Sequence, residues 1–330
     1  MRIFDCTLRD GGNVFGKGFA AEDTVMMLEG LIEARIEDIE YGHCTGIGST
    51  KADGSNKAPL TDIEYLELAQ PYVNQANLGM FVGWKNATPE NVKLAKKYGL
   101  KFLRVGINAG DGAEGIAGIR AVKKEGLSCK AALMKAYVLS PQDLAEEAKK
   151  YEEAGLDHAI IMDSAGTMLP AQVGQYVKTL KKTLTIPVGF HGHNNLGLAS
   201  ANALAALEAG ADTIDGGLLG MARSAGNIAT ELVMALLEQA GTNPYDFYAL
   251  MRFLDSRLVP RMQEEGYQHF NKPLDIILGL AGAHSSFTPL FQKVAKEEKV
   301  DFYRLIVQVS KENRKNPSED FMRQIAKTLE

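Results

Sequence analysis

The sequence predicts an α/β protein of the (β/α)8-barrel class, the TIM barrel, followed by a helical C-terminal region. Short runs rich in β-branched and aromatic residues alternate with amphipathic stretches at intervals of roughly 25–35 residues, as in repeated βα units. A barrel of this class takes about 250 residues. The chain has 330 residues, which leaves room for a smaller appendage, and strand signals stop at about residue 240.

Eight strands are expected from the positions of the short apolar runs. In chain order they are Ile3–Thr7, Asp38–His43, Leu78–Trp84, Phe102–Ile107, Ala131–Val138, Ala159–Asp163, Pro187–His193 and Thr213–Leu218. Helices are expected between them; in one such segment Ser140 is a candidate N-cap and Gly155 a candidate stop. An open Rossmann sheet would need a G-x-G-x-x-G turn after its first strand, where this sequence reads RDGGNVFG. The barrel is therefore the favoured architecture.

The chain beyond the eighth strand is predicted to be helical. Three segments have helical patterns, at 245–263, 288–313 and 317–330. No low-complexity linker precedes them, so we expect this region to pack on the barrel. The expected division is a catalytic barrel over residues 1–241 and a helical domain over residues 242–330.

Composition and charge argue against several classes of function. Apolar residues make up 45% and charged residues 23%, as in an ordinary globular protein, and the formal net charge is −5. No basic run is dense enough to follow a phosphate backbone, so nucleic-acid binding is not expected. Cys6, Cys44 and Cys129 have no paired spacing, which fits a reducing compartment. We see no signal peptide and no apolar stretch of the roughly 20 residues that span a bilayer, so the cytoplasm is expected and a membrane is not.

A metal site is predicted at the end of the seventh strand. His191 and His193 are two residues apart, so on a strand both imidazoles point to the same face and can converge on one ion. The alternative is that both rings merely bond to neighbouring backbone. Asp10, after the first strand, is the best candidate for an oxygen ligand. Arg9 beside it is either a surface ion-pair partner or a fixed charge for a developing enolate.

Other polar residues also fall near strand ends, where barrel enzymes place their active sites. Glu40 and Asp163 are each structural if taken alone, but together with Asp10 they predict a charged barrel mouth. In the loop 220–227, Asn227 is equally a ligand or a cap. His43 is expected to line the mouth. Two further histidines, without a spacing argument, are expected to be structural, namely His158 and His269.

Four segments together resemble the DRE-TIM metallolyase superfamily: DCTLRDGG at 5–12, the strand that holds Glu40, HGHNNLGLASANALAALEAGAD at 191–212, and GMARSAGN at 220–227. The segment 280–326 is similar to the C-terminal domain of the 4-hydroxy-2-oxovalerate aldolases. The loop after the eighth strand lacks the catalytic cysteine of the hydroxymethylglutaryl-CoA lyases. The chain is also too short for the regulatory domain that the related synthases usually carry. The aldolase branch is therefore favoured.

The resemblance implies roles for individual residues. Asp10, His191 and His193 would bind Mn²⁺ or Mg²⁺, with Zn²⁺ less favoured; Arg9 would stabilise the enolate oxygen; Glu40 would orient Arg9. Ser164, next to Asp163, would help to hold the carboxylate of the 2-oxo acid. The reaction implied is cleavage or formation of a 4-hydroxy-2-oxo acid, with a 2-oxo acid and an aldehyde as partners. The resemblance also implies an acylating aldehyde dehydrogenase bound through the C-terminal helices, and a homo-oligomer is expected.

Two residues depart from the aldolase pattern. Asn13 stands where these aldolases have a catalytic histidine, and His284 stands where they have a tyrosine. One hypothesis is that His284 has taken over proton transfer, because an amide is no base near neutral pH. The alternatives are a reshaped acceptor pocket, with Asn13 and His43 among its substrate-binding residues, or a lost activity.

Lys135, expected late in the fifth strand, leaves three interpretations open. It forms a Schiff base in a metal-free aldolase, pairs with a second carboxylate of the substrate, or points outward as a structural residue. Two functions other than an aldolase also stay open. One is a Claisen-type synthase that joins a 2-oxo acid to an acyl-CoA, and the other is an inactive barrel that binds a partner.

Overall fold

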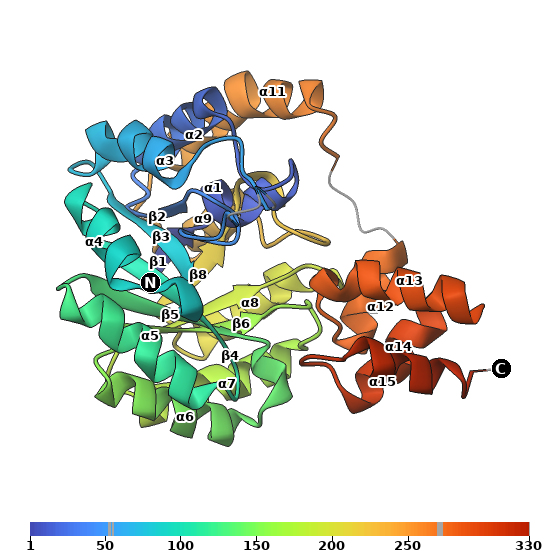
Figure 1. Ribbon diagram of the computed structural model, residues 1–330. Coiled ribbons are helices and arrows are strands. Elements are labelled where there is room, and N and C mark those ends of the chain that lie inside the picture. The colour runs from blue at the N-terminus through green and yellow to red at the C-terminus, as the bar shows by residue number, and fades with distance from the viewer. Residues whose placement is uncertain (52–53, 55, 269–272, 330) are drawn as a thin grey trace.

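The computed structural model describes residues 1–51, 54, 56–268 and 273–329, and it is a closed barrel of eight parallel strands in chain order (Figure 1). This confirms the predicted fold class. His269, expected to be structural, lies outside the described residues. The strands are β1 (Arg2–Asp5), β2 (Asp38–Tyr41), β3 (Asn77–Gly83), β4 (Phe102–Asn108), β5 (Ser128–Met134), β6 (His158–Asp163), β7 (Val188–Gly192) and β8 (Thr213–Gly216).

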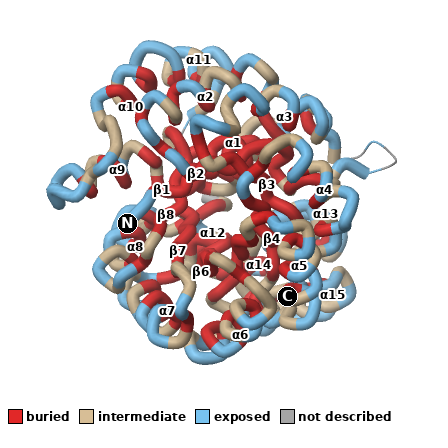
Figure 2. Tube along the Cα trace, turned by 90° about the vertical axis from the view of Figure 1, so that its left-hand side faces the viewer, coloured by how far each residue is buried: buried red, intermediate tan, exposed pale blue. Residues whose placement is uncertain are grey.

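Helices surround the barrel, and their inner faces are buried with the strands (Figure 2). They are α1 (Thr7–Asp10), α2 (Ala21–Glu33), α3 (Asp62–Ala69), α4 (Pro89–Lys97), α5 (Gly112–Lys124), α6 (Pro141–Glu153), α7 (Pro170–Thr183), α8 (Ala199–Glu208) and α9 (Thr230–Gln239). The cap predicted for α6 is present, since Ser140 Oγ accepts from the backbone N–H of Asp143 at 3.1 Å. The predicted stop is present too, because Gly155 has a φ of 105° just after that helix.

Two predicted strand ends are wrong in ways that matter for the site. β1 ends at Asp5, because Asp5 Oδ1 accepts from the backbone N–H of Thr7 at 2.9 Å and the chain turns into α1. Asp10 therefore ends a helical turn rather than following the strand directly. β5 runs over Ser128–Met134 rather than Ala131–Val138, since Lys135 has a φ of 57° and starts a short 3-10 helix at Ala136–Val138.

The C-terminal region is helical, as predicted, but it has two parts. α10 (Phe247–Phe253), a π-helical turn (Leu254–Leu258) and α11 (Val259–Glu264) share the core of the barrel. The second part contains α12 (Pro273–Ala281), a 3-10 turn (Ser285–Phe287), α13 (Thr288–Glu298), α14 (Phe302–Glu312) and α15 (Glu319–Ala326). This part has its own core, and it covers one end of the barrel (Figure 1).

Helix α12 was not predicted, because its sequence PLDIILGLA is almost uniformly apolar and shows no amphipathic period. It lies close to the loop after β7: a Cβ added at Gly279 would lie 2.7 Å from Cβ of Asn195. Within the described part of the chain, no single helix is long and apolar enough to cross a membrane. The segments Leu274–Ala281 and Ser285–Glu298 pass that test of length and hydropathy only as a pair, bent by 118°.

Candidate active site

A cavity of about 210 Å³ lies at the carboxyl end of the barrel strands, where (β/α)8 enzymes place their active sites. The strand ends and the loops after them supply most of its wall, and one residue of the C-terminal region completes it. The lining residues are Arg9, Asp10, Cys44, Thr45, Phe81, Met134, Met162, Ser164, His191, His193, Arg223 and His284.

Three lining residues are placed to share one metal ion. Asp10, His191 and His193 offer ligand atoms that all lie within 4.8 Å of one another, and all three side chains are buried. The two Nε2 atoms are 3.4 Å apart, and Asp10 Oδ2 lies 3.5 Å from Nε2 of His191 and 3.9 Å from Nε2 of His193. One carboxylate and two imidazoles form a donor set for a divalent ion that keeps open positions for a substrate.

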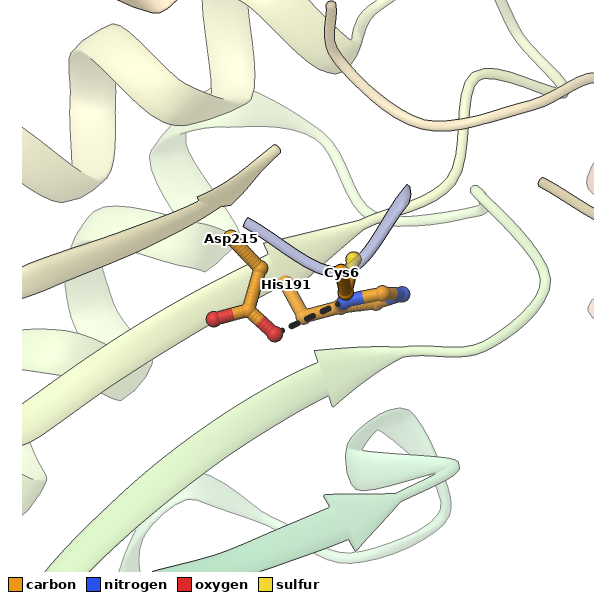
Figure 3. A group of neighbouring side chains, drawn as sticks. All are labelled: Cys6, His191 and Asp215. Atoms are coloured by element: carbon orange, nitrogen blue, oxygen red, sulfur yellow. Dashed lines mark hydrogen bonds and ion pairs between the residues drawn. The ribbon is translucent and has the colours of Figure 1, made fainter. Parts of the chain in front are cut away.

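Asp215 of β8 orients His191 from behind. Its Oδ2 lies 3.0 Å from His191 Nδ1 (Figure 3). This leaves Nε2 to face Asp10, whose Oδ2 lies 3.5 Å away. Cys6, at the end of β1, also lies close enough to this pair to form a second candidate metal group. Asp215 is already bound by Arg104, however, and Cys6 Sγ donates to the carbonyl of Gly216. The carboxylate therefore supports His191, as carboxylates commonly do behind metal-binding histidines.

The pKa shifts of His193 and Asp10 suit a metal ion. Burial lowers the pKa of His193 to about 3, so its ring is neutral and able to act as a ligand near neutral pH. Burial opposes the ionisation of Asp10, but Arg9 and the two histidines outweigh it and keep the pKa of Asp10 below its ordinary value. Asn227, a ligand or a cap on the sequence alone, donates to Asp10 Oδ2 at 3.1 Å.

Arg9 is fixed beside the metal group by buried charges. Its Nε donates to Glu40 Oε2 at 2.6 Å, and its Nη1 lies 3.1 Å from Asp10 Oδ1. Glu40 also accepts from Nε of the fully buried Arg104 at 2.7 Å. The Nη2 atom of Arg9 is buried and has no hydrogen-bond partner among the described residues. A fixed guanidinium with an unpaired N–H group is suited to an oxyanion.

The two positions that depart from the aldolase pattern lie on either side of Arg223. Asn13 Oδ1 accepts from Arg223 Nη2 at 3.3 Å, and its Nδ2 donates to the Asp10 carbonyl at 2.9 Å and to Asp10 Oδ1 at 3.2 Å. His284 Nε2 lies 3.5 Å from Arg223 Nη1. His284 Nδ1 lies 2.7 Å from Ser286 Oγ and 3.2 Å from the backbone nitrogen of Ser286. A guanidinium can only donate, so Nε2 faces Arg223 with its lone pair and the proton of the neutral ring is assigned to Nδ1, beside Ser286 Oγ.

Ser164 and Lys135 are neighbours, but only Ser164 lines the cavity. Ser164 Oγ accepts from the backbone N–H of Lys135 at 2.9 Å. The Nζ of Lys135 donates to the Lys315 carbonyl at 2.6 Å and lies 5.3 Å from the centre of the Phe287 ring. Burial lowers its pKa to about 8. The side chain of Lys135 thus joins the barrel to the C-terminal helices.

Three other predicted residues do not line the cavity, because their side chains make hydrogen bonds to other parts of the protein. The Nε2 of His43 lies 2.7 Å from the Asn56 carbonyl, and its Nδ1 accepts from the backbone N–H of Thr45 at 3.1 Å. Asp163 accepts from the backbone N–H groups of residues 167 and 168 at 3.0 and 2.8 Å, so it holds the loop after β6. His158 is buried and contacts Thr213, as expected of a structural residue.

Sequence reasoning did not single out Arg104, Asp215 or Arg223. Arg104, in FLRVGIN, and Asp215, in TIDG, are charged residues inside otherwise apolar strands. This pattern could have indicated a buried charged pair. Which strand faces they share depends on the closure of the barrel. Arg223 lies within the loop motif GMARSAGN, but its neighbours come from distant parts of the chain.

Comparisons with known proteins identify the family of this chain. Residues 1–256 match the HMGL-like family model, and the chain belongs to that family. The chain is also similar along its whole length to proteins named 4-hydroxy-2-oxovalerate aldolase. It is 32% identical over 330 residues to the one from Carboxydothermus hydrogenoformans, covering 100% of this chain and 97% of that protein. It is 34% identical to the one from Pelotomaculum thermopropionicum, covering 99% and 95%. These findings confirm the resemblance stated from the motifs.

The fold is shared more widely. The carboxyl transferase domain of pyruvate carboxylase from Rhizobium etli, in a structure with pyruvate, superimposes with a TM-score of 0.80. The match covers 100% of this chain and 60% of that chain at 18% sequence identity. At this identity the likeness concerns the fold alone.

Arg104→Met tests the buried charge network. The substitution leaves Glu40 and Asp215 buried without their shared cation, so we expect the free energy of unfolding to fall by about 3–5 kcal/mol. Urea denaturation measures this. Lys293→Met is the control, because it removes an exposed ion pair with Glu319 and should cost less than about 1 kcal/mol. Equal losses in the two variants would contradict the central role of Arg104.

Proposed function

We propose that this protein is a divalent-metal-dependent aldolase, a carbon–carbon lyase that cleaves or forms a 4-hydroxy-2-oxo acid. The products of cleavage are a 2-oxo acid, such as pyruvate, and an aldehyde. One observation carries the proposal: the donor set of Asp10, His191 and His193 lies in the same small cavity as Arg9, whose Nη2 is unpaired. The full-length similarity to proteins named 4-hydroxy-2-oxovalerate aldolase supports the same reaction class.

The donor set favours Mn²⁺ or Mg²⁺, held by Asp10, His191 and His193. A carboxylate with two imidazoles and open positions suits such ions; Zn²⁺, which imidazole binds equally well, is the alternative. When bound, the ion supplies a Lewis acid that acidifies C3 of a 2-oxo acid and stabilises the enolate. Asp215 keeps His191 aimed at this position through Nδ1.

Arg9 and Ser164 are proposed to act on the 2-oxo acid. The unpaired Nη2 of Arg9 donates to the enolate oxygen, and Glu40 holds the guanidinium so that little reorganisation is needed. Ser164, which lines the same cavity, binds the carboxylate of the acid. Asn13 holds Asp10, and His43, Asp163 and Lys135 position the surrounding loops.

His284 is proposed to move the proton at the aldehyde oxygen. It lines the cavity, and Nε2 faces Arg223 without a proton. Burial and the nearby charges of Arg223 and Lys135 keep the pKa of His284 well below its ordinary value, so the ring is neutral. During cleavage Nε2 takes the proton of the 4-hydroxyl group and the ring becomes an imidazolium; during synthesis the imidazolium gives that proton to the aldehyde oxygen. The amide of Asn13 has no group able to do this.

The remaining expectations concern organisation. We propose that residues 1–241 form the catalytic barrel and residues 242–330 a helical region, whose helices α12–α15 have their own core. We propose that these helices bind an acylating aldehyde dehydrogenase. A homo-oligomer in the cytoplasm is likewise proposed. Lys135 Nζ is bound to the Lys315 carbonyl and lies outside the cavity lining, which argues against a Schiff-base aldolase.

The enolate half of the reaction is tested without knowing the aldehyde. We expect solvent deuterium to enter C3 of pyruvate or 2-oxobutyrate in the presence of Mn²⁺, and the exchange to stop when a chelator is added. Proton NMR measures the exchange after removal of the metal. Asp10→Asn is the matched variant and should slow exchange at least about 100-fold, because one ligand charge is lost. Exchange that persists in chelator would refute a metal-dependent enolate.

Asp215→Asn tests the support of His191. The amide cannot hold the Nδ1 proton with a full negative charge, so we expect affinity for Mn²⁺ to fall by about 10–100-fold. Isothermal titration calorimetry measures this. Asp212→Asn is the control, since Asp212 pairs with Lys181 at the opposite end of the same strand and should leave Mn²⁺ affinity unchanged. If Asp215→Asn and the native protein bind Mn²⁺ with equal affinity, Asp215 does not support the metal site.

His284→Ala tests proton transfer. We expect turnover of a 4-hydroxy-2-oxo acid to fall about 10²–10⁴-fold, the usual contribution of a general acid or base. Coupled detection of released pyruvate measures this. Ser286→Ala removes only the hydroxyl that lies 2.7 Å from His284 Nδ1 and should cost much less. Unchanged turnover in His284→Ala would show that another group moves the proton.

A further inference from the structure

Arg223 lies where two hollows meet. It lines the 210 Å³ cavity with the metal group, and it also lines a larger neighbouring hollow of about 610 Å³. The polar lining of that hollow includes Asn13, Ser224, Ser285 and Thr288, and also two carboxylates. Glu265 pairs with Arg261 at 2.6 Å, and Asp275 Oδ1 accepts from Ser224 Oγ at 3.0 Å. A substrate that is held by its 2-oxo acid end against Arg9 therefore has a route for its other end past Arg223.

The guanidinium of Arg223 has no ion-pair partner among the residues that the structure describes. Its hydrogen bonds within the described ranges go to neutral side chains, Asn13 at 3.3 Å and His284 at 3.5 Å, and both contacts are long. The ion pairs of the described residues likewise do not include Arg223. By contrast, Arg9 and Arg104 in the same barrel mouth each bind carboxylates at short range. A half-buried cation without a counter-charge is costly to keep unless a ligand supplies that charge.

The loop that carries Arg223 is fixed rather than free to withdraw. Ser224 Oγ donates to Asp275 Oδ1 of α12 at 3.0 Å, and Asn195 Nδ2 donates to Ser224 Oγ at 2.7 Å. The backbone N–H of Gly226 donates to the Arg223 carbonyl at 3.1 Å. Ser224 has a φ of 56°, a conformation that this close bonding maintains. The base of the side chain is thus held at the junction of the two hollows.

An anion at Arg223 would not be the carboxylate of the 2-oxo acid. That group belongs, on the function proposed above, beside the metal group, where Arg9 and Ser164 line the cavity. Arg223 lies on the side of Asn13 and His284, at the opening towards the larger hollow. A second negative group, carried by the aldehyde part of the substrate, is the ligand that this position fits.

We propose that Arg223 selects the aldehyde: the preferred acceptor bears a terminal oxyanion, a carboxylate or a phosphate, which binds its guanidinium. A planar fork of donors suits both groups. This inference rests on the aldolase function proposed above and adds the substrate class. The hydroxyl groups of Ser285 and Thr288 in the larger hollow suit a hydroxylated acceptor chain.

Matched pairs of acceptors test the proposal, with pyruvate as donor and Mn²⁺ present. Succinic semialdehyde is compared with butanal, and glycolaldehyde phosphate with glycolaldehyde. We expect kcat/KM for the charged member of at least one pair to exceed that of its neutral partner by about 10–100-fold, the effect of a charge-assisted hydrogen-bond pair. The pair with the larger ratio identifies carboxylate or phosphate as the preferred group.

The variants Arg223→Met and Arg223→Lys test whether Arg223 causes the preference for charged acceptors, measured as the ratio of kcat/KM between the members of a pair. We expect Arg223→Met to bring the ratio close to one and Arg223→Lys to keep part of it. Arg314→Met removes an exposed cation that lies over Tyr137, outside both hollows, and should keep the native ratio. Circular dichroism checks that each variant is folded.

Three results would overturn the inference: no preference for charged acceptors in the native protein, a ratio that survives in Arg223→Met, or a ratio lost equally in Arg314→Met. Deuterium exchange at C3 of pyruvate, which needs no acceptor, is measured on the same samples. If metal-dependent deuterium exchange occurs but charged acceptors are not preferred, the inference about Arg223 is overturned and the proposed aldolase function stands. Absence of metal-dependent exchange overturns the proposed aldolase and this inference with it.

Discussion

The buried side chain of Arg104 is the constraint on which the rest of the site depends. It binds Glu40 and Asp215 at once, and each of these carboxylates orients one functional group, Arg9 in one case and His191 in the other. These residues lie on the strands β2, β4, β7 and β8 and on the turn α1, and closure of the barrel brings them together. Because burying a charge without a partner is so costly, the positions of Arg9 and His191 are coupled through a single cation.

This coupling explains why the polar groups of the barrel mouth tolerate burial. Asp10, Glu40 and Asp215 face Arg9 and Arg104, and burial lowers the pKa of His193 so that its ring stays neutral. These three carboxylates exceed the two guanidinium groups by one negative charge, which suits a bound metal cation. Arg223, at the edge of the site, has no ion-pair partner among the described residues.

The barrel and the pair of metal-binding histidines were predictable from the sequence, whereas two strand ends were not. The eight strands follow from the alternation of apolar runs and amphipathic helices, and the H-x-H pair follows from the two-residue period of a strand. Strand ends were less certain, because a side-chain bond at Asp5 and a left-handed turn at Lys135 end their strands early.

Contacts between segments far apart in the chain could not be predicted from local sequence patterns. Arg104 and Asp215 meet across the interior of the barrel, and their pairing depends on the register of strands far apart in the chain. His43 and Asp163 lie near strand ends as expected, but backbone groups of the following loops bind their side chains. The proximity of Asn13, Arg223 and His284 depends on how helices α12–α15 rest on the barrel.

The origin of His284 has a consequence for how such a protein changes over evolutionary time. The ligands and Arg9 come from the barrel, whereas His284 follows α12 and belongs to a unit with a separate hydrophobic core. On the proposed function, the wall that faces the aldehyde is thus encoded in two stretches of the gene, the barrel loop that carries Arg223 and the helical unit that carries His284. Substitutions in the helical unit alter one side of that wall without touching the buried ion network, so the aldehyde side can change while the carbanion chemistry is inherited intact.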